Sequence, residues 1–146
     1  TGWRIGWMVL PDDILRRTQI LQQNLFIAAP TLSQVAATAA LGERTYAEAQ
    51  KAHYAQNRPL LVEGLRRLGF GVDDSDGAFY AYADASRFTN DSLGFCRTML
   101  EQGGVAANPG IDFDRTNGHR YIRFSYAGSR DTMEKALDRL ASFLRR

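Results

Sequence analysis

Two arginines stand out among the residues whose side chains could do chemistry. Arg4 is the one charged residue in the apolar run at residues 3–10, and Arg123 lies in the middle of the strand-like segment at residues 120–126. A guanidinium in apolar surroundings needs a negative partner, such as a carboxylate, a phosphate or an anionic ligand. This pattern alone favours an internal salt bridge to one of the 16 acidic residues over an anion-binding role.

The other reactive side chains do not form a recognisable catalytic or metal-binding set. His53 and His119 are the two histidines, and neither has clustered acidic or cysteine neighbours that would complete a metal site. Cys96 lies in an apolar helical segment without a basic neighbour to activate its thiol, so packing is its predicted role. The sequence therefore predicts no metal site and no complete catalytic apparatus within this chain.

Length and composition place these residues in a packed globular chain. The 146 residues are 45% hydrophobic and 23% charged, and no apolar run is long enough to span a membrane. The net charge is 18 − 16 = +2, and the arginine pairs at 16–17, 66–67 and 145–146 are far apart, which indicates helix surfaces instead of a nucleic-acid site. A single cysteine excludes an internal disulfide and predicts a cytoplasmic protein.

The apolar patterns predict alternating helices and strands. Residues 3–10 read as a buried parallel-type strand, and residues 43–68 read as one long helix that contains Pro59. Thr31 or Ser33 is expected to cap a helix over residues 34–41. The remaining expected elements are helices at 12–25, 90–102 and 131–144 and strands at 77–82, 105–107 and 120–126.

Within the last strand, alternation sets the direction of Arg123. Tyr121, Arg123 and Ser125 share one face, and the apolar row of Ile122, Phe124 and Tyr126 occupies the other. Arg123 is therefore expected to face a polar cleft. At the other end, the chain has no initiator methionine and becomes strand-like almost at once after Thr1, which predicts a piece of a longer protein.

Five motifs in consistent order resemble class I/II aminotransferases, the fold type I enzymes that use pyridoxal 5′-phosphate. They are TGWRIGW at 1–7, SQVAATAAL at 33–41, DGAFY at 76–80, GVAANPG at 104–110 and YIRFSYA at 121–127. The resemblance covers the whole chain and places it in the C-terminal part of such an enzyme. It implies an α/β fold in which residues 1–42 are the edge of the large domain, 43–68 a linking helix and 69–146 a small domain.

The resemblance also implies residue roles. Arg4 matches the arginine that binds the cofactor phosphate, and Arg123 matches the one that binds the substrate α-carboxylate. Tyr80, Asn108 and Gly110 fall in segments near the substrate in relatives. The lysine that forms the Schiff base would lie upstream of Thr1, so this chain alone is expected to contain no catalytic residue and to be inactive.

The function implied is transfer of an amino group between an amino acid and a 2-oxo acid, within amino-acid metabolism. A homodimer is implied because the loop equivalent to residues 27–31 approaches the neighbouring subunit in the family; no nucleic-acid or membrane partner is expected. One alternative is an aminotransferase-like effector-binding domain of a transcription regulator, which a DNA-binding module upstream would identify. Another is a small independent ligand-binding domain.

Overall fold

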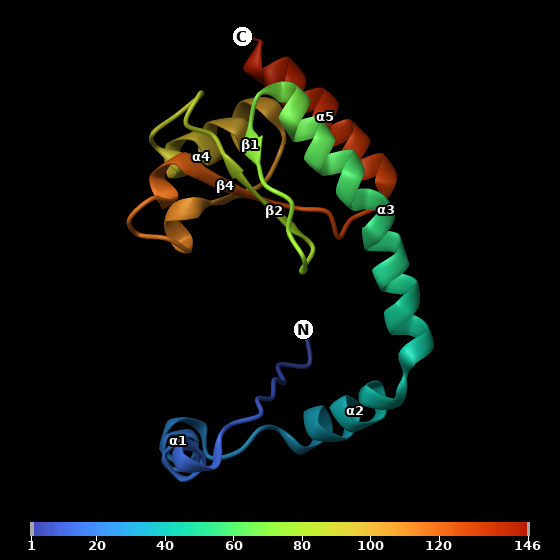
Figure 1. Ribbon diagram of the computed structural model, residues 1–146, viewed down its shortest axis with the longest axis vertical. Helices are drawn as coiled ribbons and strands as arrows, with labels where there is room; N and C mark the ends of the chain where they lie inside the picture. Colours follow the sequence, from blue (N-terminus) through green and yellow to red (C-terminus); the bar gives the residue numbers. More distant parts are fainter. Residues whose placement is uncertain (1, 146) are drawn as a thin grey trace. The chain divides into compact units, whose positions relative to one another are not determined.

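The structure is a computed structural model that describes residues 2–145 (Figure 1). Thr1, the first residue of the first motif, and Arg146, of the last arginine pair, lie outside the described residues. The chain divides into two compact units, Thr1–Glu48 and Ala49–Arg146, and helix α3 (Arg44–Leu68) contributes to both. No helix in the described part is both long and apolar enough to cross a membrane.

The first unit contains helices α1 (Asp12–Phe26) and α2 (Thr31–Gly42), which follow an extended segment. Asp12 and Asp13 lie in the first turn of α1, where negative charge favours a helix start. The cap expected for α2 is absent: the helix begins directly after Pro30 without a side-chain cap. The Ser33 hydroxyl instead donates a hydrogen bond to the Trp3 carbonyl oxygen at 2.7 Å.

The buried strand expected at residues 3–10 is wrong. These residues form no strand, and Trp3, Trp7, Met8 and Val9 are all largely exposed. An apolar run becomes a strand only when neighbouring strands satisfy its backbone groups, and no described segment pairs with it. The apolar composition of residues 3–10 does not make a strand by itself, because the neighbouring strand that it would pair with is not among the described residues.

The second unit is built on a four-stranded antiparallel sheet in the order β1-β2-β4-β3. Tyr80 pairs with Ser125, and Tyr82 pairs with Arg123, across the central strands. The strands are β1 (Gly71–Val72), β2 (Tyr80–Asp84), β3 (Asn108–Pro109) and β4 (Tyr121–Ser125).

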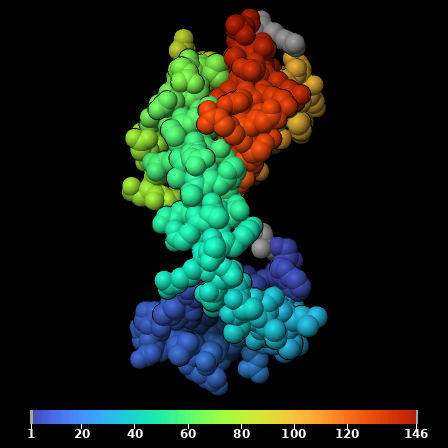
Figure 2. Space-filling model, turned by 90° about the vertical axis from the view of Figure 1, so that its right-hand side faces the viewer, coloured from blue at the N-terminus to red at the C-terminus, as the bar shows by residue number. Residues whose placement is uncertain are grey.

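Three helices supply the rest of the core of this unit: α3, α4 (Ser92–Gly103) and α5 (Arg130–Leu144). Helices α3 and α5 lie side by side (Figures 1 and 2), and a Cβ atom added to Gly64 of α3 would meet the Leu137 side chain of α5. The apolar side chains of the sheet pack with those of the helices in one buried cluster. The fully buried members include Leu65, Ala83, Met99, Ile122 and Leu140.

Two of the predicted strands differ from those in the structure. The strand expected at 77–82 begins only at Tyr80, because Ala78 has a positive φ of 62° that bends the backbone before it. The strand expected at 105–107 is wrong: the Val105 N–H donates to the Met99 carbonyl and so closes the end of α4. Pairing with β4 starts at Asn108 instead.

Candidate functional site

Arg123 lies on the face of β4 that points away from the core. Ile122 and Phe124 are buried, whereas Tyr121 and Arg123 are half-buried and Ser125 is exposed. This alternation is the one predicted from the sequence, and it follows from the two-residue repeat of a strand with one buried face. Arg123 therefore lies in the middle of the sheet face opposite the one that packs on the core.

Three neighbours hold the Arg123 guanidinium. Its Nη2 donates a hydrogen bond to Asn108 Oδ1 at 3.2 Å, from the strand paired with it in register. The guanidinium carbon lies 4.1 Å from the centre of the Tyr80 ring and 4.0 Å from the centre of the Phe113 ring. Cations at this distance over a ring face are attracted by the electron-rich surface of the ring.

No carboxylate of the described residues lies within ion-pair distance of Arg123. The internal salt bridge that the sequence pattern favoured is therefore not formed within the described chain. The Arg123 Nε is buried and has no hydrogen-bond acceptor there. A guanidinium that has no carboxylate partner and leaves part of its donor fork unused is suited to bind a planar anion such as a carboxylate.

Phe113 is positioned by a tight turn between β3 and β4. The Phe113 N–H donates to the Gly110 carbonyl at 2.9 Å, within the short helix η1 (Gly110–Asp112). Asp114 then accepts hydrogen bonds from the backbone N–H groups of Thr116 and Asn117, which hold the pKa of its carboxyl below the ordinary value. The segment reaches β4 through η2 (Gly118–Arg120).

The sequence pointed to Tyr80 and Asn108 only as residues near the substrate in relatives, and it missed Phe113. Phe113 is half exposed and follows a turn, so neither a helical nor a strand period marks it. The signal that could have identified it is a large aromatic side chain three residues after the Asn-Pro-Gly turn.

Arg4 belongs to the first unit, in the extended segment before α1. It is exposed, in contrast to the buried position expected from the sequence, and no hydrogen bond or ion pair joins it to another described residue. Its backbone has a positive φ of 51°, which costs energy for a residue other than glycine. Residues held in such conformations cluster at active sites and ligand-binding sites, although Ile27 and Ala78 also have a positive φ in this chain.

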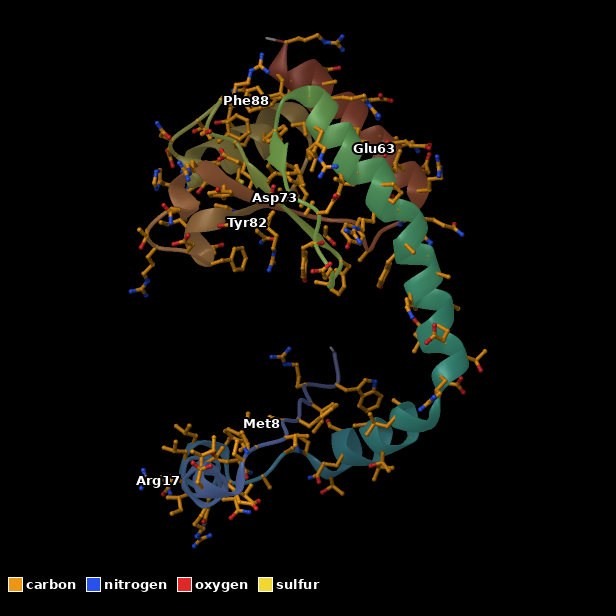
Figure 3. All side chains as sticks on the ribbon, in the orientation of Figure 1. Met8, Arg17, Glu63, Asp73, Tyr82 and Phe88 are labelled. Atoms are coloured by element: carbon orange, nitrogen blue, oxygen red, sulfur yellow. The ribbon has the colours of Figure 1, made fainter. Side chains whose placement is uncertain are left out.

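A groove of about 600 Å³ lies on the polar side of the second unit, beside Tyr80. Asp73 and Tyr82, both labelled in Figure 3, line this groove together with Tyr121. The rings of Tyr82 and Tyr121 are stacked, with their centres 4.8 Å apart. Burial and the Asp114 charge raise the pKa of the Tyr82 hydroxyl. No group of three or more potential metal ligands occurs in the described chain.

The family model of aminotransferase class I and II matches residues 1–140. The chain is 48% identical to a valine–pyruvate aminotransferase of Mycobacterium tuberculosis, covering 99% of this chain and 38% of that protein. It is 36% identical to a (5-formylfuran-3-yl)methyl phosphate transaminase of Methanocaldococcus jannaschii, again covering 99% of this chain and 38% of the relative.

Solved structures agree with the sequence comparison. An aminotransferase from Mycobacterium tuberculosis superimposes with a TM-score of 0.87 at 46% identity, covering 99% of this chain and 38% of that one. An N-succinyldiaminopimelate aminotransferase from the same organism gives a TM-score of 0.82 at 30% identity, covering 97% and 38%. The chain thus spans about two fifths of the length of these relatives, and the resemblance and fold class inferred from its motifs are confirmed.

Proposed function

The chain belongs to the class I and II aminotransferases, and we propose that the protein containing it transfers an amino group between an amino acid and a 2-oxo acid. The observation that carries this proposal is the Arg123 guanidinium, which is held by Asn108 and two rings but is not neutralised by any described carboxylate. Within the protein, residues 1–42 are proposed as the edge of a large domain, 43–68 as the linking helix and 69–146 as a small domain.

Arg123 is proposed to bind the α-carboxylate that every amino-acid and 2-oxo-acid substrate carries. Its planar fork can donate two parallel hydrogen bonds to the two carboxylate oxygens, which fixes the orientation of the substrate as well as its position. A fixed carboxylate in turn fixes the direction of the Cα–H bond that must be broken. Such positioning lowers the activation free energy because less orientational freedom remains to be lost.

Pyridoxal 5′-phosphate is the proposed cofactor, and Arg4 is the residue of this chain that fits it. The Arg4 side chain is exposed and unpaired in the described chain, so its guanidinium can accept a phosphate as a charge-assisted partner. When bound, the cofactor supplies an electron sink for the bond-breaking step. Lys135 is ion-paired to Asp131 at 2.7 Å, and we propose that the lysine bound to the cofactor is not in this chain, which alone is inactive.

The protein is proposed to be a homodimer and to be located in the cytoplasm. Leu25, Phe26 and Ile27, at the end of α1, are exposed apolar side chains, and Ile27 is 80% exposed. An exposed apolar patch of this kind supports contact with another protein surface. The single cysteine, Cys96, supports a reducing compartment.

Substitution of Arg123 by lysine in the whole protein tests the proposed function. We expect Arg123→Lys to lower kcat/KM by about 2–4 kcal/mol of transition-state free energy for every amino-acid substrate, because a point charge replaces a bidentate fork. The cofactor spectrum should stay unchanged. Steady-state kinetics with acidic, aliphatic and aromatic amino acids would measure this.

Arg120→Lys is the matched control. Arg120 precedes the same strand, but its Nε lies 4.0 Å from an Asp84 carboxylate oxygen, so its charge already has a partner. We expect kcat/KM to change little in this variant. If Arg123→Lys reduced activity with acidic substrates alone, Arg123 would be a side-chain reader; an unchanged kcat/KM with all substrates would remove Arg123 from the site.

A further inference from the structure

The Arg123 side chain makes few directional contacts for a residue that must present a fixed fork. Among the described residues its one hydrogen bond is the 3.2 Å contact from Nη2 to Asn108 Oδ1, and its Nε has no acceptor. A single hydrogen bond permits rotation about the bonds of a long side chain, which has four side-chain torsions. Something besides Asn108 must therefore restrict the guanidinium plane.

The two aromatic rings provide that restriction. The centres of the Tyr80 and Phe113 rings lie 4.1 and 4.0 Å from the guanidinium carbon, closer than the 5.3 Å between Arg120 and the Tyr121 ring. The rings come from independent elements. Tyr80 begins β2, diagonally across the sheet from Arg123, and Phe113 follows η1 in the turn between β3 and β4. A ring on each of two elements confines the plane in a way that one ring cannot.

We propose that Tyr80 and Phe113 are positioning residues that hold the Arg123 guanidinium in the orientation in which it receives a carboxylate. Their ring faces stabilise the cation without using its N–H donors, so the free donors stay available to a ligand. A carboxylate or amide in either place would occupy those donors instead. The tyrosine hydroxyl is not needed for this role, because the ring face makes the contact with the guanidinium.

The inference is tested first by NMR on this chain, without cofactor or substrate. Ring currents should shift the Arg123 side-chain signals upfield, and Phe113→Leu and Tyr80→Leu should each move them back toward the positions of a free arginine. Phe113→Tyr and Tyr80→Phe keep the rings and should preserve the shifted signals. Tyr82→Leu is the matched control, because Tyr82 shares the sheet face but stacks on Tyr121 instead; it should leave most of the shift in place.

Kinetics of the whole protein form a second test, which rests on the proposed function. Phe113→Leu should lower kcat/KM by about 2- to 30-fold, the range between losing an exposed and a desolvated cation–ring contact, and Phe113→Tyr should restore it. If the parent protein transferred no amino group, the proposed function would fail while the NMR result still stood.

Three outcomes would overturn the positioning role itself. The first is an Arg123 spectrum that is unchanged in both leucine variants. The second is an equal response to Tyr82→Leu, which would show a general disturbance of the sheet. The third is loss of the folded amide spectrum in both Phe113→Leu and Tyr80→Leu, which would mean that the rings are needed for folding. If only one of these variants folds, the Arg123 side-chain signals of that variant test the proposal.

Discussion

Arg123 differs from Arg66 and Arg130 of the second unit in the partners of its guanidinium donors. Arg66 donates from Nε and Nη2 to the Val72 carbonyl at 2.9 and 2.7 Å, and Arg130 is ion-paired to Glu134 at 2.9 Å. Those guanidiniums already have the partners that a charged donor requires. Arg120 and Arg123 each have a buried Nε with no hydrogen-bond acceptor, but Arg120 has the Asp84 carboxylate 4.0 Å away, whereas Arg123 has no carboxylate of the described residues within ion-pair distance. Leaving such a charged donor unsatisfied has a free-energy cost that a bound anion would offset.

A second prediction concerns Arg4 and the retention of the proposed cofactor. If Arg4 binds the cofactor phosphate as proposed, Arg4→Ala in the whole protein should weaken retention of pyridoxal 5′-phosphate, because that charge-assisted contact would be lost. The measurement is cofactor absorbance remaining after extensive dialysis. Arg17→Ala, which removes an exposed arginine of α1, should retain the cofactor as the parent does. Equal retention by Arg4→Ala and the parent would assign Arg4 a role outside the cofactor site.

Cys96 gives a prediction about reactivity and pH. Burial, with a smaller effect of the Asp112 charge, raises the pKa of its thiol to about 11. The folded chain therefore keeps the thiol proton at a pH where the unfolded chain loses it, so Cys96 contributes stability below about pH 9 that is lost as the pH rises toward 11. At pH 8 we expect Ellman's reagent to react only after unfolding in urea. Rapid stoichiometric reaction of the folded chain would contradict the burial of Cys96.

At the scale of elements, the close crossing of η1 and η2 determines where Phe113 lies. A Cβ atom at Gly110 would stand 2.6 Å from both the Gly118 and the Tyr121 carbonyl oxygens, and one at Gly118 would collide with the Gly110 backbone. Both neighbours are backbone atoms, which cannot move without shifting β4. Gly110→Ala should therefore destabilise the second unit by about 1–3 kcal/mol, as overpacking does.

Urea unfolding followed by near-ultraviolet circular dichroism would measure that loss, since the tyrosines of the second unit give the signal. Gly77→Ala is the control, because a Cβ atom there meets nothing within 4 Å. Its free energy of unfolding should stay within about 0.5 kcal/mol of the parent. Similar stabilities for the two variants would mean that η1 and η2 can separate at little cost.

The elements show which parts of the fold could be predicted from the sequence. Alternation in β4 and the apolar stripe of α3 predicted both elements to within one or two residues, because each pattern is created by a buried face that is present in the chain. The Arg123 position followed from the same alternation. The contact of Phe113 with Arg123 could not be predicted, because it depends on the approach of Gly110 to Gly118, which are separated in sequence and brought together only by the fold.

The run at residues 3–10 failed for a related reason. Its composition is that of a buried strand, yet Trp7 and Val9 are largely exposed. A strand is defined by its pairing, and pairing depends on other segments of sequence. The same segment illustrates why Arg4 was expected to be buried: burial was inferred from its apolar neighbours, which are themselves exposed here.

At the scale of the whole molecule, the two units differ in how much apolar surface they bury. Every buried hydrophobic side chain of the described residues lies at or after Leu61, whereas Ser33 is the one buried residue among residues 2–48. Helices α1 and α2 are 15 and 12 residues long. Isolated helices shorter than about 12–15 residues are marginal in water, so tertiary contacts would have to stabilise them.

The protection of backbone amides against hydrogen exchange should therefore differ between the two units of this chain. We expect β2, β4 and α5 to be protected up to the global free energy of unfolding of the second unit, because their backbone groups lie around the buried core. Amides of α1 and α2 should exchange with little protection. Mass spectrometry of peptic peptides after short and long labelling would measure both sets in one sample.

The same peptides in the whole protein provide the control. The chain covers 38% of the valine–pyruvate aminotransferase and 38% of the aminotransferase structure from Mycobacterium tuberculosis. If the protein that contains this chain has a comparable length, as proposed, we expect its remaining part to bury exposed apolar side chains of the first unit, such as Trp7, Leu25 and Phe26. Protection of α1 and α2 should rise there, while that of β4 changes less. If α1 were as strongly protected as β4 in the chain alone, its exposed apolar residues would have to be covered by contacts between copies, which a concentration series would reveal as protection that disappears on dilution.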